Sequence, residues 1–479
     1  MNEPAPEFDL LLLDGLILTA DPACPEIRNG ALGIRHGRIA WLDRAPPREY
    51  SAARVLPLSG HFITPGFVNP HAHSILAMVR GNAVDAGFAP SYTPGIPTGT
   101  SVNAEQARAL ARLGALEALL FGSTLLGDHF VHADVTTPAM AELGLRLCPS
   151  WRIHDVDFGA VAHGRWRYDA AIGARTLDGA MALHETWKGH PRVRVNLAAH
   201  AVDTCSDDLL RQIAAIAAKH ELIVSTHLAQ SKVEVDRVRE RTGKTSTEVL
   251  EDVGLLNGRL MGGHCIYLTD ADIGRMAGAG AHAVHIPKAN ASSGRLAPTP
   301  ALKRAGVNLA LATDTQHADM IELMRWALVT ARIQEGHVDD DWQPRHVFHM
   351  ATLGGARAVG MENEIGSLVV GKRADVVVFD ARRPHLVPHV NPLGNLVHTG
   401  QGRDVSMVIV DGEILVEGGR PTRVDMDEVC REGEQAAREL WAGVGRRYWE
   451  HRGGNGRAAL CPDGAAPTRG ASASSRIAT

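Results

Sequence analysis

The hydrophobic positions of this chain follow two patterns, one at its two ends and one in its middle. Near the N-terminal end, short apolar runs at residues 9–18, 31–34 and 39–42 are separated by turn residues such as His36 and Gly37. Short apolar runs bounded by turn residues are typical of β-strands joined in hairpins. The pattern therefore predicts a small β unit in the first sixty or so residues.

The same pattern returns near the C-terminal end. Residues 366–380 read as strand, turn and strand, and Asp411-Gly412 separates the apolar runs 405–410 and 414–416. Asp-Gly is typical of a two-residue hairpin turn. Neither end has enough strands to be stable alone. We therefore expect residues 1–60 and 364–425 to form one composite β-sandwich domain.

The middle of the chain, residues 61–363, alternates buried strands with amphipathic helices such as those expected at 105–120, 207–220, 233–241, 270–277 and 320–333. Continuous apolar strands that alternate with helices favour a parallel sheet. Eight such units predict a (β/α)8 barrel, whose active site lies at the carboxyl ends of its strands. The alternative, a doubly wound open sheet, lacks its usual Gly-rich phosphate loop here. The eight expected strands are residues 63–68, 123–129, 145–153, 193–200, 222–227, 260–265, 282–286 and 307–314.

Three segments lie outside this repeat. Residues 426–453 are expected to form a C-terminal helix, and the Gly-, Ala- and Ser-rich tail 454–479 is expected to be disordered. Residues 81–102 hold three prolines and several glycines directly after the first barrel strand. A long first loop in a barrel usually covers or shapes the site.

Composition limits the classes of function. The chain has 479 residues and a formal net charge of −5, which provides no basic surface for nucleic acid or an anionic membrane. Its six cysteines form no Cys-x-x-Cys pair, and the apolar run 10–13 is too short for a signal peptide or membrane span. We expect a cytoplasmic protein that acts on a small molecule, as a homodimer or higher homo-oligomer.

Polar side chains follow most of the expected barrel strands. Parallel strands end at one rim, so these side chains should meet there. Three imidazoles with a carboxylate suit zinc or iron, and such a metal lowers the pKa of bound water to about 7. The residues are His71 and His73 after the first strand, His200 after the fourth, His227 after the fifth, His264 after the sixth and Asp314 after the eighth.

Structural roles remain open for some of these residues. His227 could be a hydrogen-bonded core histidine, Asp314 could cap the following helix, and His200 could be structural. His129 and His285 also end strands, and we interpret them as loop or core residues. His317 and Asp319 are interpreted as solvent-facing or capping residues.

Five motifs together resemble one known group. They are Pro-Gly-Phe-Val-Asn-Pro-His-Ala-His at 65–73, Thr-His-Leu-Ala at 226–229, Gly-His-Cys at 263–265, Ala-Thr-Asp at 312–314 and Gly-Lys-Arg-Ala-Asp at 371–375. Over residues 8–425 the chain is similar to the amidohydrolase superfamily. The likeness is greatest to the branch of methylthioadenosine/S-adenosylhomocysteine deaminases, guanine and cytosine deaminases and triazine hydrolases.

The resemblance implies a role for each matching residue. It makes His71, His73, His227 and Asp314 ligands of one divalent metal ion, with zinc expected first and iron as the alternative. It makes His264 catalytic, together with Asp314 as a proton carrier, and turns His200 toward the substrate. Two-metal members use a bridging lysine on the fourth strand, and residues 193–200 contain none.

The chain departs from the family pattern at two places. Deaminases of this branch read His-x-x-Glu after the fifth strand, whereas residue 230 here is Gln230. An amide cannot supply the proton that the glutamate gives to a ring nitrogen, so Gln230 is expected to hydrogen-bond the substrate instead. After the seventh strand, residues 286–290 also differ from the family pattern, and Lys288 could face an anionic or carbonyl group or lie in solvent.

These features predict a metal-dependent hydrolase that cleaves a non-peptide C–N bond of a heterocyclic amine or related small molecule. One alternative is a hydrolase of a substituted urea, carbamate or cyclic amide, which would release an amine. The other is a barrel that binds a ligand without catalysis, because the family's glutamate is absent.

Overall fold

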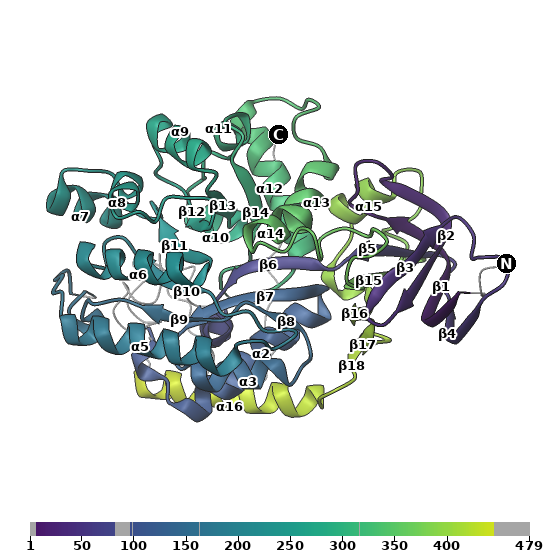
Figure 1. Ribbon diagram of the computed structural model, residues 1–479, viewed down its shortest axis with the longest axis horizontal. Helices are drawn as coiled ribbons and strands as arrows, with labels where there is room; N and C mark the ends of the chain where they lie inside the picture. The colour runs from purple at the N-terminus through teal and green to yellow at the C-terminus, as the bar shows by residue number, and fades with distance from the viewer. Residues whose placement is uncertain (1–5, 82–95, 98, 162, 316, 445–479) are drawn as a thin grey trace, which may run out of the picture.

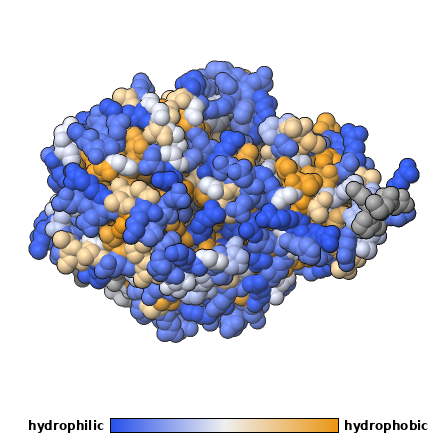
Figure 2. Space-filling model, in the orientation of Figure 1, coloured by the Kyte–Doolittle hydropathy of each residue, from blue (hydrophilic) through white to orange (hydrophobic). Residues whose placement is uncertain are grey.

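The computed structural model describes residues 6–81, 96–97, 99–161, 163–315 and 317–444, in which helices surround one of two β-sheets (Figure 1). No helix among these residues is both long and apolar enough to span a lipid bilayer. Hydrophilic residues cover most of the face in Figure 2, and hydrophobic residues gather in separate patches over the barrel and the small sheet.

One sheet is the predicted (β/α)8 barrel. Its strands are parallel and follow the order β6-β7-β9-β10-β11-β12-β13-β14, with β8 paired to β7. A parallel bridge between Ala72 and Asp314 joins the first and last strands, so the ring is nearly closed. The barrel strands are β6 (Phe67–Ala72), β7 (Ser123–Phe130), β8 (Arg146–Leu147), β9 (Ser150–Ile153), β10 (Leu197–Ala201), β11 (Val224–Leu228), β12 (Leu260–His264), β13 (His282–His285) and β14 (Asn308–Leu311).

Helices follow most barrel strands and form the outer ring (Figure 1). Side-chain caps begin several of them: the side chain of Asn103 caps α2, Ser206 caps α6, Ser231 caps α7 and Thr269 caps α9. The helices are η1 (Ser74–Val79), η3 (Gly99–Ser101), α2 (Ala104–Leu120), α3 (Ala133–Ala141), α4 (Phe158–Val161), α5 (Ala170–Trp187), α6 (Asp207–His220), α7 (Lys232–Thr242), α8 (Ser246–Asp252), α9 (Asp270–Ala279), α10 (Pro287–Ser292), α11 (Thr299–Arg304), α12 (Met320–Glu335), α13 (Pro344–Ala351), α14 (Leu353–Ala358), α15 (Pro392–His398), η4 (Gly402–Asp404) and α16 (Met426–Val444).

The second sheet is mixed and takes its strands from both ends of the chain, in the order β18-β17-β16-β15-β5-β1-β2-β3, with β4 paired to β1. The two ends meet where β15 pairs antiparallel with β5, which also pairs with β1. Apolar side chains of both ends fill one face between them. The strands are β1 (Glu7–Leu18), β2 (Glu26–Arg35), β3 (Arg38–Asp43), β4 (Ser51–Pro57), β5 (His61–Pro65), β15 (Val376–Asp380), β16 (Val405–Val410), β17 (Glu413–Glu417) and β18 (Arg420–Pro421).

The expected first barrel strand, residues 63–68, was wrong in its bounds. The run divides at Pro65-Gly66: β5 lies in the small sheet, and β6 begins the barrel at Phe67. A Cβ on Gly66 would lie 2.0 Å from Oγ1 of Thr124, so only glycine allows the chain to cross so close to β7. The expected third strand is also interrupted, between β8 and β9 at Cys148-Pro149.

The C-terminal helix is described from Met426 to Val444 and packs against α2 and η1. Near its end, Nε1 of Trp441 donates a hydrogen bond of 2.7 Å to the carbonyl of Met78 in η1. This helix therefore supports the segment that follows the first barrel strand. The expected tail 454–479 and most of the expected long loop 81–102 lie outside the described residues.

Candidate metal centre

The barrel brings the predicted polar residues together at the carboxyl ends of its strands. His71 lies in the last part of β6 and His73 directly after it, His227 lies in β11, and His264 is the last residue of β12. Asp314 follows β14. Two overlapping groups have ligand atoms that all lie within 4.8 Å of one another: His71, His73, His129 and His227, and His71, His227, His264 and Asp314.

The barrel closes at this same place. The backbone amide of His73 donates to the carbonyl of Asp314 at 2.8 Å, and the amide of Asp314 donates to the carbonyl of His71 at 3.1 Å. The side chains of the same residues also lie close together. Nε2 of His73 is 3.2 Å and Nε2 of His71 is 3.7 Å from Oδ1 of Asp314. Closure of the barrel thus aligns residues that are far apart in sequence.

Backbone carbonyls orient two of the imidazoles. Nδ1 of His73 lies 2.6 Å from the carbonyl of His129, and Nδ1 of His227 contacts the carbonyl of His200. Each Nδ1 must carry the proton in such a bond, which leaves a free electron pair on each Nε2. The two Nε2 atoms lie 3.4 Å apart. Similarly, Nδ1 of His264 donates to Oδ1 of Asn290 at 2.9 Å and leaves Nε2 of His264 available.

His71 provides a test of whether the residues suit a metal ion. Its side chain is fully buried, and neither of its ring nitrogens has a hydrogen-bond partner in the part of the chain that the structure describes. Buried polar atoms without a partner are rare and costly. Since Nε2 of His71 points with the other ligand atoms toward Asp314, a cation at this point would satisfy it. The donor set fits a divalent metal ion.

The ionisation states of these groups also suit a cation. Burial lowers the pKa of His227 to about 3, helped by the neighbouring His73 and His264. Burial and the nearby His129 hold the pKa of His71 well below its usual value. For Asp314, burial raises the pKa, but the contact with His73 and the nearness of His264 and His71 outweigh it, so the pKa lies below the ordinary range. Neutral imidazoles and an ionised carboxylate are the forms that bind metals.

Four of the eleven described non-glycine residues with positive φ lie around the same centre. Ala229, His264, Cys265 and Asp314 have φ angles of 48°, 67°, 55° and 62°, which place four non-glycine residues in the left-handed region. Such conformations cost about 1–3 kcal/mol each and cluster at functional sites. They turn the chain sharply at the ends of three strands, where His264 and Asp314 join the candidate centre.

The predicted substrate-facing residues are placed differently from one another. Nδ1 of His200 donates to Oγ1 of Thr204 at 2.9 Å, and its ring lies 5.0 Å from that of His227, beside the centre. Gln230 is buried three residues after His227. Lys288 forms an ion pair of 2.9 Å with Glu322 on α12, a contact that the sequence did not indicate.

Glu234 explains how the segment at Gln230 is held. Its buried carboxylate accepts the backbone N–H groups of Ala229 and Gln230, both at 2.8 Å, and the hydroxyl of Ser246 at 2.8 Å. These three bonds fix the backbone that leaves β11. The side chain of Gln230 is therefore carried by a rigid segment next to His227.

His129 was interpreted from the sequence as a loop or core residue, but it lies within the candidate centre. Its ring is 4.4 Å from the ring of His71 and 4.4 Å from that of His73. Its position in the last part of a barrel strand is the feature that singled out the other histidines. In contrast, Asp319 caps α12 by accepting two backbone N–H groups, as predicted.

Comparison with known proteins agrees with this centre. A family model described as the amidohydrolase family matches residues 62–415. A 5-methylthioadenosine/S-adenosylhomocysteine deaminase of Syntrophobacter fumaroxidans is 31% identical over 442 residues, which cover 90% of this chain and 98% of that protein. A 5'-deoxyadenosine deaminase of Methanothermobacter thermautotrophicus is 32% identical over 423 residues, with coverages of 86% and 95%.

Solved structures show the same fold. An adenosine deaminase from Xanthomonas campestris with bound zinc has a TM-score of 0.81 and 24% identity, and the alignment covers 92% of this chain and 100% of that one. An atrazine chlorohydrolase variant from Arthrobacter aurescens, solved with zinc and atraton, has a TM-score of 0.81 and 22% identity, with coverages of 89% and 100%.

Proposed function

The chain belongs to the amidohydrolase family, and on that premise we propose that it is a zinc-dependent aminohydrolase of heterocyclic amines. As a member of the family it is a metal-dependent hydrolase that acts on C–N bonds of small molecules. The observation that supports this proposal most is the convergence of His71, His73, His227 and Asp314 where the barrel closes.

These four residues would hold the metal ion, and the unpartnered ring nitrogens of His71 are the clearest sign of it. A divalent metal supplies a water molecule whose pKa is lowered to about 7 and polarises the carbon under attack. Zinc suits a set of imidazole nitrogens with one carboxylate oxygen. The carbonyls of His129 and His200 keep the rings of His73 and His227 turned toward the ion.

Asp314 and His264 would carry the proton chemistry. The depressed pKa of Asp314 keeps its carboxylate ionised, so it can accept the proton of the attacking water and pass it to the leaving nitrogen. His264 is oriented by Asn290 and presents Nε2 to the centre. There it can steady the charge that develops on the substrate during addition.

Gln230 and His200 would contact the substrate. The relatives named above deaminate adenine nucleosides according to their names, so these compounds are the first class to test. Gln230 favours a second candidate, a cyclic amide or substituted urea, because an amide side chain pairs with a carbonyl but does not protonate a ring nitrogen. The pairing with Glu322 leaves Lys288 poorly available, and we do not include it.

The test is a substrate screen on zinc-loaded and chelated protein. Adenine nucleosides, aminopurines, triazines, hydantoins and aryl ureas would be assayed for released ammonia or amine. We expect turnover of at least one compound, loss of activity after chelation, and recovery with zinc. Full activity of the metal-free protein would contradict the proposal, and release of an alkyl- or arylamine alone would support the second candidate.

A further inference from the structure

A second group of possible metal ligands lies on the outside of the barrel. His184 is in the last turn of α5, Glu185 follows it, and His220 is the last residue of α6. One ligand atom from each residue lies within 4.8 Å of the other two. The two imidazole rings are 5.5 Å apart and nearly perpendicular, and Nε2 of His184 is 3.9 Å from Oε1 of Glu185.

The barrel architecture explains why these residues meet. α5 and α6 are neighbours in the outer ring and run in the same direction, so they end at the same level. That level is the face where the strands begin, since the cavity beside His184 is lined by Val195 and Leu222, which precede β10 and β11. The group therefore lies at the opposite end of the barrel from His200 and His227.

The two imidazoles are available to a ligand, and Glu185 makes an exposed ion pair of 3.8 Å with Lys188, a weak contact that a metal ion can replace. Among the described residues, neither His184 nor His220 makes a hydrogen bond through its ring, and the ring of His184 lies beside Glu185 and His220. The side chain of His184 is 13% exposed and held by packing, whereas that of Glu185 is 57% exposed and can rotate. Ligand atoms around a tetrahedral zinc ion are about 3.3 Å apart, so a small rotation of these side chains would complete the geometry.

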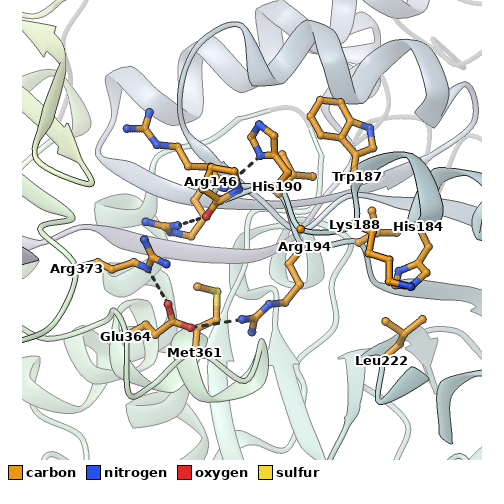
Figure 3. A pocket seen from close by; sticks show the side chains of 15 residues that line it. Arg146, His184, Trp187, Lys188, His190, Arg194, Leu222, Met361, Glu364 and Arg373 are labelled. Carbon is orange, nitrogen blue, oxygen red and sulfur yellow. Dashed lines mark hydrogen bonds and ion pairs between the residues drawn. The ribbon is translucent and has the colours of Figure 1, made fainter. Parts of the chain in front are cut away.

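A cavity of about 340 Å³ adjoins this group. In Figure 3 His184 and Lys188 lie at one side of it, apart from the ion pairs that join Arg373 and Arg194 to Glu364. Because those charged groups are already paired, they do not compete for His184. A fourth coordination position at the metal would open into this cavity and could be filled by water.

We propose that His184, Glu185 and His220 bind one divalent transition metal ion, separate from the ion of the catalytic centre. Two imidazoles and a carboxylate suit zinc, nickel or copper and not calcium or magnesium, which prefer oxygen ligands. Since the ligands come from two helices, the ion would join α5 to α6. An ion that binds only the folded chain stabilises the folded state, so the bound metal would stabilise the packing of α5 against α6.

The experiment measures bound zinc in the untagged, full-length protein after equilibration with zinc and removal of the excess. We expect about two equivalents per chain in the wild type, and about one in His184→Gln and in His220→Gln. His190→Gln is the matched control, because His190 lines the same cavity without belonging to the group. It should retain two equivalents, and all variants should keep the hydrolytic activity of the wild type.

A single equivalent in the wild type, or a second equivalent that persists in both histidine variants, would overturn the proposal. If either histidine variant fails to fold, Glu185→Gln provides the test, because this exposed side chain can be changed without disturbing the core. Zinc should then bind the second site at least about tenfold more weakly, and an unchanged affinity would equally refute the assignment.

Discussion

The side-chain amide of Asn69 in β6 joins Thr313 across the seam of the barrel. Its Nδ2 donates to Oγ1 of Thr313 at 2.7 Å, and its Oδ1 accepts the backbone N–H of Thr313 at 3.1 Å. Asn69 is fully buried, so water cannot replace these bonds. This pair sets the distance between β6, which carries His71, and the segment that carries Asp314.

We expect Asn69→Ala to weaken metal binding by about 10–100-fold, as the loss of groups that orient metal ligands usually does. The matched control is Asn308→Ala, which removes a hydrogen bond of 3.0 Å to the carbonyl of Gly354 at the other end of β14. Both variants should unfold at a lower temperature, but only Asn69→Ala should lose zinc to a competing chelator. Equal zinc affinities would show that the seam does not position the ligands.

Two overlapping groups of ligands are possible at the centre, one that contains His129 and one that contains Asp314. Substitution of these two residues shows which group binds the metal. The substitution His129→Phe keeps a ring against His71 and His73 but removes both nitrogens, so the metal should remain. The substitution Asp314→Ala removes the carboxylate that lies closest to Nε2 of His73, and the metal should be lost. Zinc content would be measured in a His220→Gln background, so that the outer site does not contribute. If His129→Phe loses zinc and Asp314→Ala retains it, His129 is a ligand and Asp314 is not.

Much of this centre was predictable because strand order fixes where strand ends meet. Each of His200, His227 and His264 lies in an apolar run of strand length, and a parallel barrel brings all such ends to one rim. The ring orientations were not predictable. They depend on the carbonyls of His129 and His200, which reach the imidazoles only after the strands have packed.

The errors in the fold also have physical reasons. Residues 62–72 are buried throughout, and apolar residues lie on both sides of Pro65-Gly66, so the hydrophobic pattern does not show that β5 and β6 belong to different sheets. The close approach of Gly66 to Thr124 separates them, and that contact joins residues far apart in sequence. His129 lies at the end of an expected strand, as the other histidines do. A pattern of strand ends does not show which of these histidines bind the metal.

An ion-pair network joins the barrel to the small sheet. Nη2 of Arg146 in β8 lies 3.0 Å from Oδ1 of Asp375 and 2.8 Å from Oδ1 of Asp411, and the side chains of Arg146 and Asp375 are each 2% exposed. The substitution Arg146→Met would leave Asp375 buried without its partner, so we expect the free energy of unfolding to fall by about 3–5 kcal/mol. Urea denaturation would measure it.

The control for that substitution is Arg194→Met. Arg194 and Arg146 line the same cavity, the one beside His184 (Figure 3). The side chain of Arg194, however, is 49% exposed, and its Nη2 lies 3.4 Å from Oε1 of Glu364. An exposed ion pair contributes about 0–1 kcal/mol, so this variant should stay close to the wild type. If the two variants lose the same stability, the buried pair does not hold the small sheet to the barrel.

Asp411 should make the stability of this junction depend on pH. Burial raises the pKa of Asp411, but Arg146 and Arg373 outweigh it, so the pKa lies below the ordinary value of 3.8. The contribution is complete above the pKa of the unfolded chain, about 3.9, and is lost as the pH falls through the folded value. Between pH 6 and pH 3, the wild type should lose more stability than Asp411→Asn. Parallel curves for the two proteins would show that Asp411 does not contribute.

The resemblance described above implies a glutamate at the position of Gln230, and the backbone of Gln230 is fixed by Glu234. If it binds a substrate carbonyl, Gln230→Glu would set a carboxylate against that acceptor, and Gln230→Met would remove the donor. We expect both to lower kcat/KM about tenfold or more on the best substrate of the screen. A general acid contributes about 10²–10⁴-fold, so Gln230→Glu alone should gain activity on an aminopurine, whose ring nitrogen needs a proton. Steady-state kinetics of the three proteins on both compounds would decide. A faster Gln230→Glu on the best substrate would mean that the native reaction needs the missing acid.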